Sequence, residues 1–554
     1  MRFVYPFTLL LFLLYVVLAC PGPYWGEGPL LTLCGRTLGI SHPPGYPLHI
    51  VLDHAFQWLP FGDAAMRANL LSALFGALAA ACIYFAGRRF GLSRWASLAA
   101  TGALALHPLV ARAATMAEVY TLNLLLTAAC LLAAATGGRR GVAVTGFLAG
   151  LAIGNHLTIV LSFPVLILLL LPTFRERHRR PALPLLALTC FLAGAAILLY
   201  HPLRARSRAP VRWDQPDRMD RFLTLVTAAD EAVPSLTRGE TLSHNLTHLL
   251  LPLITIRGLG IAGTILALAG IVTGLRDSPL RWGALLLGCL CYLIPIGLYW
   301  TNESDFFALP LFILTFLFAG RGLDAAADAI RRTGRGRLPR LLLPLPAIAL
   351  LAPILARPPV SRADCHLPRD MGRTVLATAS KQGLIISERS DMCFMLWYLQ
   401  RIEGMNSEVA VFFKHLFSFA WAAGQLRDTY PHVRFPLADD TRFEDSHIWN
   451  DTFTSAVIEM NRSRKPLLME WDLVTSLHLA PVTPRGICLM AGDDQPAEAP
   501  DLSAWRFEGA DELALAVAAE RLYGAAAALQ AGGWNAAAGR LMRDVQRLRR
   551  EAGL

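Results

Sequence analysis

The chain has 554 residues, of which 54% are hydrophobic and only 17% are charged. Soluble proteins usually carry about 25% charged residues, so this composition argues against an ordinary soluble enzyme and is typical of a membrane protein. The net charge of +10 does not indicate nucleic-acid binding, because much of the arginine lies in short loops between apolar segments, where membrane topology accounts for it.

Apolar segments long enough to cross a bilayer recur through the first two thirds of the chain. We interpret residues 3–20 as an uncleaved first helix, although Val-Leu-Ala-Cys at 17–20 leaves a cleaved signal or lipoprotein peptide as the alternative. The interrupted apolar residues 46–60 are interpreted as an interfacial or re-entrant segment. Ten further segments bring the prediction to about eleven membrane helices: 66–87, 95–111, 118–136, 141–154, 156–172, 182–200, 250–275, 282–299, 305–320 and 338–356.

Arginine is concentrated in alternate loops, which predicts the orientation of the chain. Positively charged loops stay on the cytoplasmic side, so the N-terminus is expected inside. An odd number of helices then puts the C-terminal part outside. The long segment 201–249 is the exception, since it is a basic loop on the outer side, and this invites a functional interpretation. The predicted inner loops carry Arg88, Arg89, Arg94, Arg139, Arg140, Arg175, Arg177, Arg179, Arg180, Arg276, Arg281 and a cluster from Arg321 to Arg340.

Residues after 356 have the composition of a soluble domain. Short apolar runs at 383–387, 408–413, 466–470 and 486–491 alternate with helical patterns such as 392–403, which predicts a small α/β domain over 357–510. The alanine-rich residues 511–554 predict a helical hairpin broken at Gly532 and Gly533. The expected fold is therefore mainly α: a polytopic membrane helical bundle over 1–356, the α/β domain, and a helical tail.

The first outer loop contains the most unusual polar residues of the chain. It contains Glu27 and, further along the same loop, His42. A rigid turn at the membrane surface is predicted directly after the histidine by Pro43, Pro44 and Gly45. A carboxylate and an imidazole held near an apolar boundary can serve as a tuned general base. The alternative is an ordinary rigid loop with solvated side chains.

Two further polar groups follow on the outer side. Glu118 and Asn123 flank an apolar face at the outer start of a helix, where an ionisable group is a functional candidate; the alternative is a carboxylate that complements the helix dipole. Asn155 and His156 lie between two helices, where the alternative is a polar turn.

The remaining outer candidates are basic, aromatic or acidic. Arg204 leaves the membrane at the depth of a lipid phosphate, which a guanidinium binds bidentately; the alternative is snorkelling toward lipid headgroups. Trp213 follows it, and Asp305 faces the same side, with a helix N-cap as its alternative.

Neither a Walker loop, a GxGxxG nor an HExxH motif occurs. The ten cysteines form no CxxC pair, so a zinc site is not expected, and one or two disulfides are left open.

These motifs resemble a bacterial family of membrane proteins that is similar to the eukaryotic transmembrane O-mannosyltransferases of the GT-C glycosyltransferase superfamily. The resemblance covers most of residues 20–410, and the stretch from His42 to Leu48 is its most specific part. The residues that carry it are Trp25-Gly26-Glu27, Leu38 to Leu48, Arg67 with Asn69 and Ser72, Glu118-Val119-Tyr120 with Asn123, Gly154-Asn155-His156, Pro202 to Ala205, Gly383 to Ser387, and Leu396 to Gln400 with Glu403-Gly404.

The resemblance implies an inverting hexosyl- or pentosyltransferase that moves a mannose-like sugar from a polyprenyl-phosphate donor to a hydroxyl on the outer face of the membrane. Glu27 stands where the family has the aspartate of its Asp-Ser-Gly-Glu pattern, and Leu30 replaces the family's glutamate. Glu27 and His42 are the expected catalytic residues, and Arg204 is expected to stabilise the departing phosphate. The full set of expected substrate-binding residues is Glu118, Tyr120, Asn123, Asn155, His156, Arg204, Trp213 and Asp305.

No cofactor is predicted beyond the lipid-linked donor, and a divalent metal is left open. The expected partners are the polyprenyl-phosphate sugar and a protein, glycan or lipid acceptor, without nucleic acid, and the expected location is the bacterial cytoplasmic membrane. Two alternatives stay open. A transporter or flippase of a lipid-linked sugar would favour paired broken helices in two similar halves, and a non-catalytic factor for envelope-polysaccharide assembly would agree with the loss of the second acidic residue.

Overall fold

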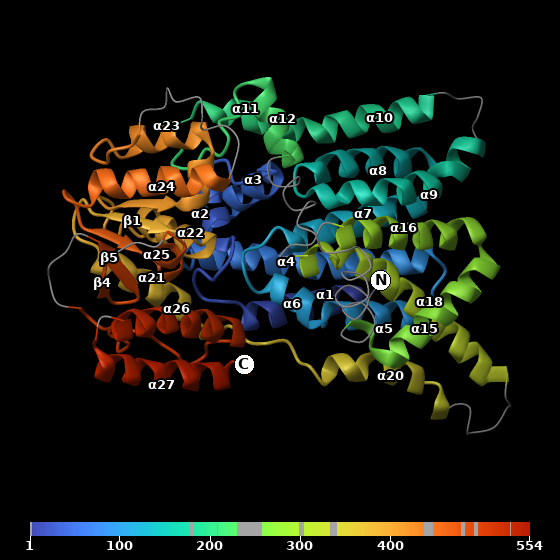
Figure 1. The fold of residues 1–554 in the computed structure, drawn as a ribbon. Helices are drawn as coiled ribbons and strands as arrows, with labels where there is room; N and C mark the ends of the chain where they lie inside the picture. Colours follow the sequence, from blue (N-terminus) through green and yellow to red (C-terminus); the bar gives the residue numbers. More distant parts are fainter. Residues whose placement is uncertain are drawn as a thin grey trace.

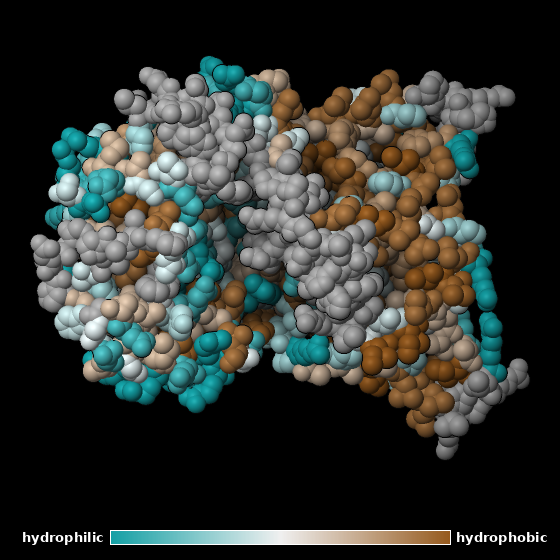
Figure 2. All heavy atoms as spheres, in the orientation of Figure 1, coloured by the Kyte–Doolittle hydropathy of each residue, from teal (hydrophilic) through white to brown (hydrophobic). Residues whose placement is uncertain are grey.

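The structure, a computed structural model, describes residues 3–176, 182–207, 209–229, 258–298, 304–332, 341–436, 447–477, 482–491, 497–531 and 533–554. A bundle of helices forms one part of the molecule, and a small sheet with its own helices forms the other (Figure 1). Hydrophobic side chains cover most of the visible surface of the bundle, whereas the sheet-containing part is largely hydrophilic (Figure 2). An exposed apolar surface of this extent is expected of helices that face lipid.

Six helical stretches among the described residues are long and apolar enough to cross a membrane. They are α4 (Ala64–Arg89), η1 with α9 (Leu157–Ser162 and Phe163–Glu176), α10 with its extensions η2 and α11 (Ala182–Ala195, Ala196–Leu199 and Tyr200–Ala205), α15 (Gly260–Asp277), α16 (Pro279–Leu298) and α18 (Leu309–Arg332). The other helices of the bundle are α1 (Val4–Leu18), α5 (Arg94–Ala105), α6 (Pro108–Ala114), α7 (Tyr120–Thr136), α8 (Gly138–Ile153), α17 (Ser304–Phe307) and α20 (Leu345–Leu355).

The predicted membrane bundle is confirmed, but the structure does not establish eleven crossings. The predicted helix 95–111 is divided between α5 and α6, because Pro108 cannot continue α5 and instead begins the next helix with His107 as its N-cap. Residues 250–257 and 338–340 of two predicted helices, and the segment 230–249 with Arg238, lie outside the described residues. The apolar stretch 46–60 contains only the short helix α3 (Pro47–Phe56).

A pair of glycines allows α15 and α18 to pack closely. A Cβ on Gly322 of α18 would overlap the carbonyl oxygen of Leu266 in α15, and a Cβ on Gly270 of α15 would overlap that of Phe318 in α18. Small residues that let helix backbones approach are a common basis of helix association in membranes.

We therefore expect Gly322→Ala to destabilise the bundle by about 1–3 kcal/mol, the usual cost of overpacking a close contact. Gly102→Ala on α5 is the matched control, because the nearest atom to its added Cβ is Phe7 Cζ at 3.9 Å. Thermal unfolding of the purified protein in detergent measures both effects. Equal unfolding midpoints for the two variants would contradict this account of the α15–α18 contact.

The C-terminal part contains a five-stranded sheet in the order β2-β1-β3-β5-β4, in which β2, β1 and β3 are parallel. Its strands are β1 (Leu384–Ser387), β2 (Ala410–Phe413), β3 (Leu467–Met469), β4 (Val482–Arg485) and β5 (Cys488–Ala491). Four of them fall on the predicted runs, and β4 was not predicted. The helices are α21 (Leu367–Thr378), α22 (Ser390–Arg401), η5 (Lys414–Ser418), α23 (Ala420–Thr429), α24 (His447–Asn461), α25 (Trp471–Ser476), α26 (Glu512–Ala531) and α27 (Asn535–Glu551).

The loop between α1 and α4, here named the first outer loop after the side on which the sequence predicts it, joins the two parts of the molecule. It contains a helix that was not predicted, α2 (Gly28–Thr37), which packs against α22. Leu30 of α2 is fully buried in a cluster that includes Phe394 of α22 and Trp213. The position where the resembling family has a second acidic residue is therefore a core position in this chain.

All ten cysteines are free thiols in the structure.

Candidate functional site

A cavity of about 560 Å³ lies where the membrane bundle, the first outer loop and the C-terminal sheet meet. Apolar residues of the membrane helices form one wall, and residues that follow the strands form another. Its lining includes Glu27, His42, Pro43, Pro44 and Tyr46 from the first outer loop; His156, Leu157, Thr158, Leu161, Pro295, Ile296 and Phe307 from the bundle; Trp213, Thr227 and Ala228 from the segment after α11; and Ser390, Phe394, Phe413 and His415 from the C-terminal part.

Glu27 and His42 form a close pair in this cavity. His42 Nε2 lies 2.8 Å from Glu27 Oε1, and the two side chains are 10% and 15% exposed. His42 Nδ1 lies 3.1 Å from the carbonyl oxygen of Pro43, which can only accept, so Nδ1 carries a proton. The carboxylate and Nε2 therefore share one further proton. The second carboxylate oxygen, Oε2, accepts no hydrogen bond from any described residue, so it is able to accept one from a substrate.

The backbone explains why these two side chains meet. Glu27 is the residue immediately before α2, and the turn before it passes through Gly26 at φ +89°. The turn after His42 passes through Gly45 at φ +86°, and a Cβ there would overlap the His201 ring. Only glycine combines this left-handed backbone with such close packing.

Trp213 reaches the cavity because the segment after α11 pairs with the first outer loop. The amide of Ile40 donates to the Val211 carbonyl at 2.9 Å, and the amide of Trp213 donates to the Ile40 carbonyl at 3.1 Å. The indole consequently lies edge-on to the His42 ring, with 5.9 Å between the ring centroids. Two segments far apart in the sequence thus contribute neighbouring side chains to one site.

His156 lines the cavity among aromatic rings. Its ring centroid lies 5.5 Å from that of Tyr120, 6.3 Å from Tyr46 and 5.1 Å from Phe307. Tyr120 lies behind His156, stacked on Phe306 of α17 at 4.8 Å.

Asn155 and Asn123 also lie behind the cavity wall. Asn155 Nδ2 donates to the Val119 carbonyl at 3.1 Å, and Asn123 Nδ2 donates to Thr158 Oγ1 at 2.9 Å. Their contacts are those of residues that support the wall around His156.

Six predicted site residues are absent from the cavity lining: Tyr120, Asn123 and Asn155, which lie behind it, and also Arg204, Glu118 and Asp305. Arg204 Nε donates to the Leu38 carbonyl at 2.8 Å and Nη2 to the Thr37 carbonyl at 3.3 Å, so its guanidinium binds the C-terminal end of α2. Glu118 is buried beside Gly26, next to the loop that carries Glu27. Asp305 lies in α17, the helix whose Phe307 does reach the cavity.

The prediction missed the part of the site that the C-terminal sheet supplies. Ser390 follows β1, Phe413 ends β2, and His415 follows it, so all three lie at the carboxyl edge of the parallel strands. That edge is where open α/β sheets bind ligands. The strands themselves were predicted, and residues directly after them were a usable signal. Within the described ranges, no group of three His, Cys, Asp or Glu side chains is placed to hold a metal ion.

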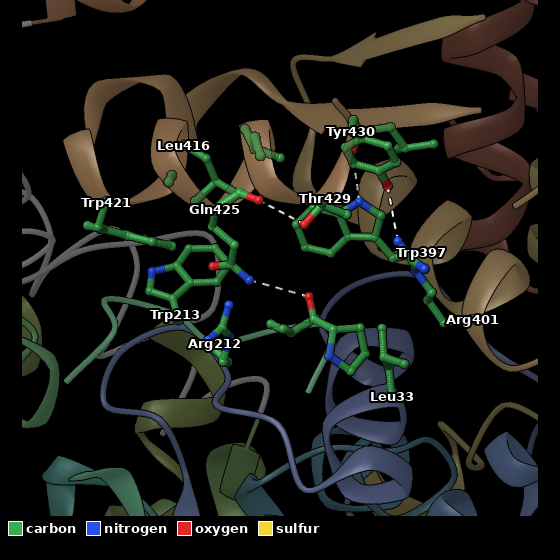
Figure 3. Close-up of a pocket in the computed structure, with 15 residues that line it drawn as sticks. Leu33, Arg212, Trp213, Trp397, Arg401, Leu416, Trp421, Gln425, Thr429 and Tyr430 are labelled. Carbon is green, nitrogen blue, oxygen red and sulfur yellow. Dashed lines mark hydrogen bonds between the residues drawn. The ribbon is translucent and has the colours of Figure 1, made fainter. Parts of the chain in front are cut away.

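A smaller pocket of about 50 Å³ lies beyond Trp213, between the segment after α11 and the C-terminal part (Figure 3). Trp213 and Trp421 lie side by side there with ring centroids 6.0 Å apart, and Gln425 Nε2 reaches the Pro210 carbonyl at 3.5 Å. This volume accommodates several water molecules. The lining comes from both regions, so the pocket is part of the contact between them.

Comparisons with known proteins agree with the predicted resemblance. A family model described as "Protein O-mannosyl-transferase TMEM260 N-terminal domain" matches residues 31–179. The protein O-mannosyl-transferase TMEM260 of Mus musculus is 28% identical over 445 residues, which cover 75% of this chain and 62% of that protein. The chain thus spans less than two thirds of that relative's length.

Solved structures show the fold. ArnT from Cupriavidus metallidurans, bound to undecaprenyl phosphate, superposes with a TM-score of 0.54 at 15% identity, covering 89% of this chain and 98% of ArnT. Its apo form superposes with a TM-score of 0.51 at 13% identity, covering 90% and 99%. The chain therefore resembles the O-mannosyl-transferase TMEM260 in sequence and has the fold of ArnT.

Proposed function

We propose that the chain is a membrane glycosyltransferase that moves a mannose-like sugar from a polyprenyl-phosphate donor to a hydroxyl acceptor. The observation that carries the proposal is the Glu27–His42 pair, which lines a cavity between apolar membrane helices and a polar domain. The sequence resemblance to an O-mannosyl-transferase and the fold shared with a protein that binds undecaprenyl phosphate support it.

The shape of the cavity suits two substrates of different polarity. Leu157, Leu161 and Ile296 form the membrane side, where the isoprenoid end of a lipid donor can lie without exposing its chain to water. Ser390 and His415 form the opposite side, from which a polar acceptor can approach. The anomeric carbon would then lie between these walls, within reach of Glu27.

The proposed reaction is a single displacement. Glu27 Oε2 accepts the proton of the acceptor hydroxyl, and the hydroxyl oxygen attacks the anomeric carbon. The bond from that carbon to the phosphate oxygen breaks, and its electron pair leaves with the lipid phosphate. One inversion at the anomeric carbon results. The proton shared by His42 and Glu27 keeps the carboxylate oriented and limits the charge that the buried pair must hold.

The arginine distribution supports an orientation with the N-terminus in the cytoplasm and the C-terminal domain on the outer face of the membrane, which we propose to be a bacterial inner membrane. The cavity would then open on the outer side.

The test uses the purified chain in liposomes with a polyprenyl-phosphate mannose labelled in the sugar. We expect transfer of label to hydroxyl-bearing acceptors of the native envelope, measured with added Mg²⁺ or Mn²⁺ and with a chelator. Movement of intact lipid-linked sugar between leaflets without transfer would replace the proposal with a transporter. Neither transfer nor movement would favour an assembly factor.

A further inference from the structure

His156 is the residue immediately before the short helix η1, and its ring acts as the N-cap of that helix. The backbone amide of Thr158 donates to His156 Nδ1 at 3.3 Å. A backbone amide always donates, so Nδ1 must accept and carries no proton.

The Thr158 side chain reinforces this assignment. Thr158 Oγ1 lies 2.9 Å from His156 Nδ1, and Asn123 Nδ2 donates to the same oxygen at 2.9 Å. Since the backbone amide bond leaves Nδ1 without a proton, the Thr158 hydroxyl donates to Nδ1, and its oxygen accepts from Asn123. The imidazole then holds its single proton on Nε2.

His42 is held in the opposite way in the same cavity. Its Nδ1 faces the Pro43 carbonyl, so it must donate there, and its Nε2 is engaged with Glu27. His156 instead makes no ion pair with a described acidic residue, and three aromatic rings surround it. An apolar aromatic environment disfavours the charged form of an imidazole.

We propose that His156 is a neutral hydrogen-bond donor that binds an oxygen of the lipid-linked donor through Nε2–H. Thr158 and Asn123 are positioning residues that hold this tautomer. The ligand chemistry is an oxygen acceptor, either on the phosphate or on the sugar. The proposal rests on the proposed function for the identity of the ligand but not for the tautomer. His156 neither gives up nor takes a proton during the reaction.

The tautomer is measured without any ligand. Nitrogen NMR of the purified protein with ¹⁵N-labelled histidine, compared with the spectrum of His156→Gln, assigns the two ring nitrogens of His156. We expect an unprotonated Nδ1 and a protonated Nε2 across neutral pH. A proton on Nδ1, or a charged ring, would overturn the proposal even if the protein proves to be a glycosyltransferase.

Binding of undecaprenyl phosphate and of undecaprenyl-phosphate mannose, each without an acceptor, tests the donor role. The amide nitrogen of glutamine can reach the position of Nε2, so His156→Gln is expected to keep the lipid affinity within about threefold. The amide nitrogen of asparagine reaches only the position of Nδ1, so His156→Asn is expected to lose about tenfold or more in lipid affinity. Loss with both lipids assigns the phosphate oxygen, and loss only with the mannose lipid assigns a sugar oxygen. Equal weakening by both variants would overturn the donor role.

Thr158→Val separates positioning from simple packing, because valine has the same shape but lacks the hydroxyl. Because only the longer 3.3 Å bond from the backbone amide then holds the tautomer, we expect about threefold to tenfold weaker lipid binding and a mixture of His156 tautomers in the NMR spectrum. Thr158→Ser, which keeps the hydroxyl, is expected to retain both properties. A Thr158→Val protein with an unchanged tautomer and unchanged binding would contradict the positioning role.

Discussion

Replacing Glu27 by glutamine is expected to reduce sugar transfer by about 100-fold to 10,000-fold, the range usually lost with a general base. Glutamine keeps the size of the side chain and can still contact His42, but its amide cannot accept a proton from the acceptor hydroxyl. Binding of the lipid-linked donor should change little, because the carboxylate acts on the acceptor. The measurement is single-turnover transfer of labelled mannose, with donor affinity determined separately.

Glu27→Asp is the informative companion variant. It places a carboxylate of the length that the resembling family uses at this position, but it withdraws the group from His42, whose Nε2 now lies 2.8 Å from Glu27 Oε1. We expect partial activity, between that of the native chain and of Glu27→Gln. The control is Glu459→Gln, which removes a carboxylate that is largely exposed on α24 and pairs with Arg462, away from the cavity lining. Undiminished transfer by Glu27→Gln would remove Glu27 from the mechanism.

Glu27 and His42 could be singled out as candidates because both lie in one loop, and the proline and glycine residues after His42 predict a rigid turn. Their contact could not be predicted, since α2 between them is stabilised by packing against α22. The long apolar helices such as α4 could be predicted, since the bilayer thickness sets the length of the apolar run.

The position of Arg204 depends on α2, a helix that the composition of the loop did not predict. Residues 28–37 include two glycines and a proline, which argue against a helix in isolation. Packing against α22 nevertheless stabilises α2, and the carbonyls at its end take up the Arg204 donors. A guanidinium at headgroup depth can bind phosphate or a helix end equally well, so composition alone could not decide between them.

Residues directly after the strands could be singled out from the sequence, but the sequence could not show that Ser390, Phe394 and His415 form a wall of this cavity. The strand pattern identifies the sheet, but the edge that faces the membrane bundle depends on how the domain packs on the first outer loop. That packing involves residues more than 350 positions apart, and sequence periodicity carries no information on contacts of this kind.

One buried ionic contact holds the C-terminal part to the membrane bundle. Arg362 is 3% exposed, its Nε lies 2.8 Å from Asp511 Oδ2, and its Nη1 donates to Thr115 Oγ1 of the bundle at 2.7 Å. Tyr24 of the first outer loop lies under the guanidinium at 5.0 Å and donates to Asp511 Oδ1 at 2.5 Å. Asp511 is also the residue before α26, where it accepts from the amide of Ala514.

Arg362→Leu is therefore expected to destabilise the protein by about 3–5 kcal/mol, because it leaves the Asp511 carboxylate buried without its counter-charge. The double variant Arg362→Leu/Asp511→Asn should recover a large part of this loss, since asparagine is uncharged and still caps a helix. Arg462→Leu breaks an exposed pair with Glu459 and should cost less than about 1 kcal/mol. Thermal unfolding in detergent and limited proteolysis between the two parts measure the effects. The C-terminal part also supplies one wall of the cavity, so sugar transfer should fall with Arg362→Leu and return with the double variant. Equal stability of Arg362→Leu and Arg462→Leu would show that other contacts hold the C-terminal part to the bundle.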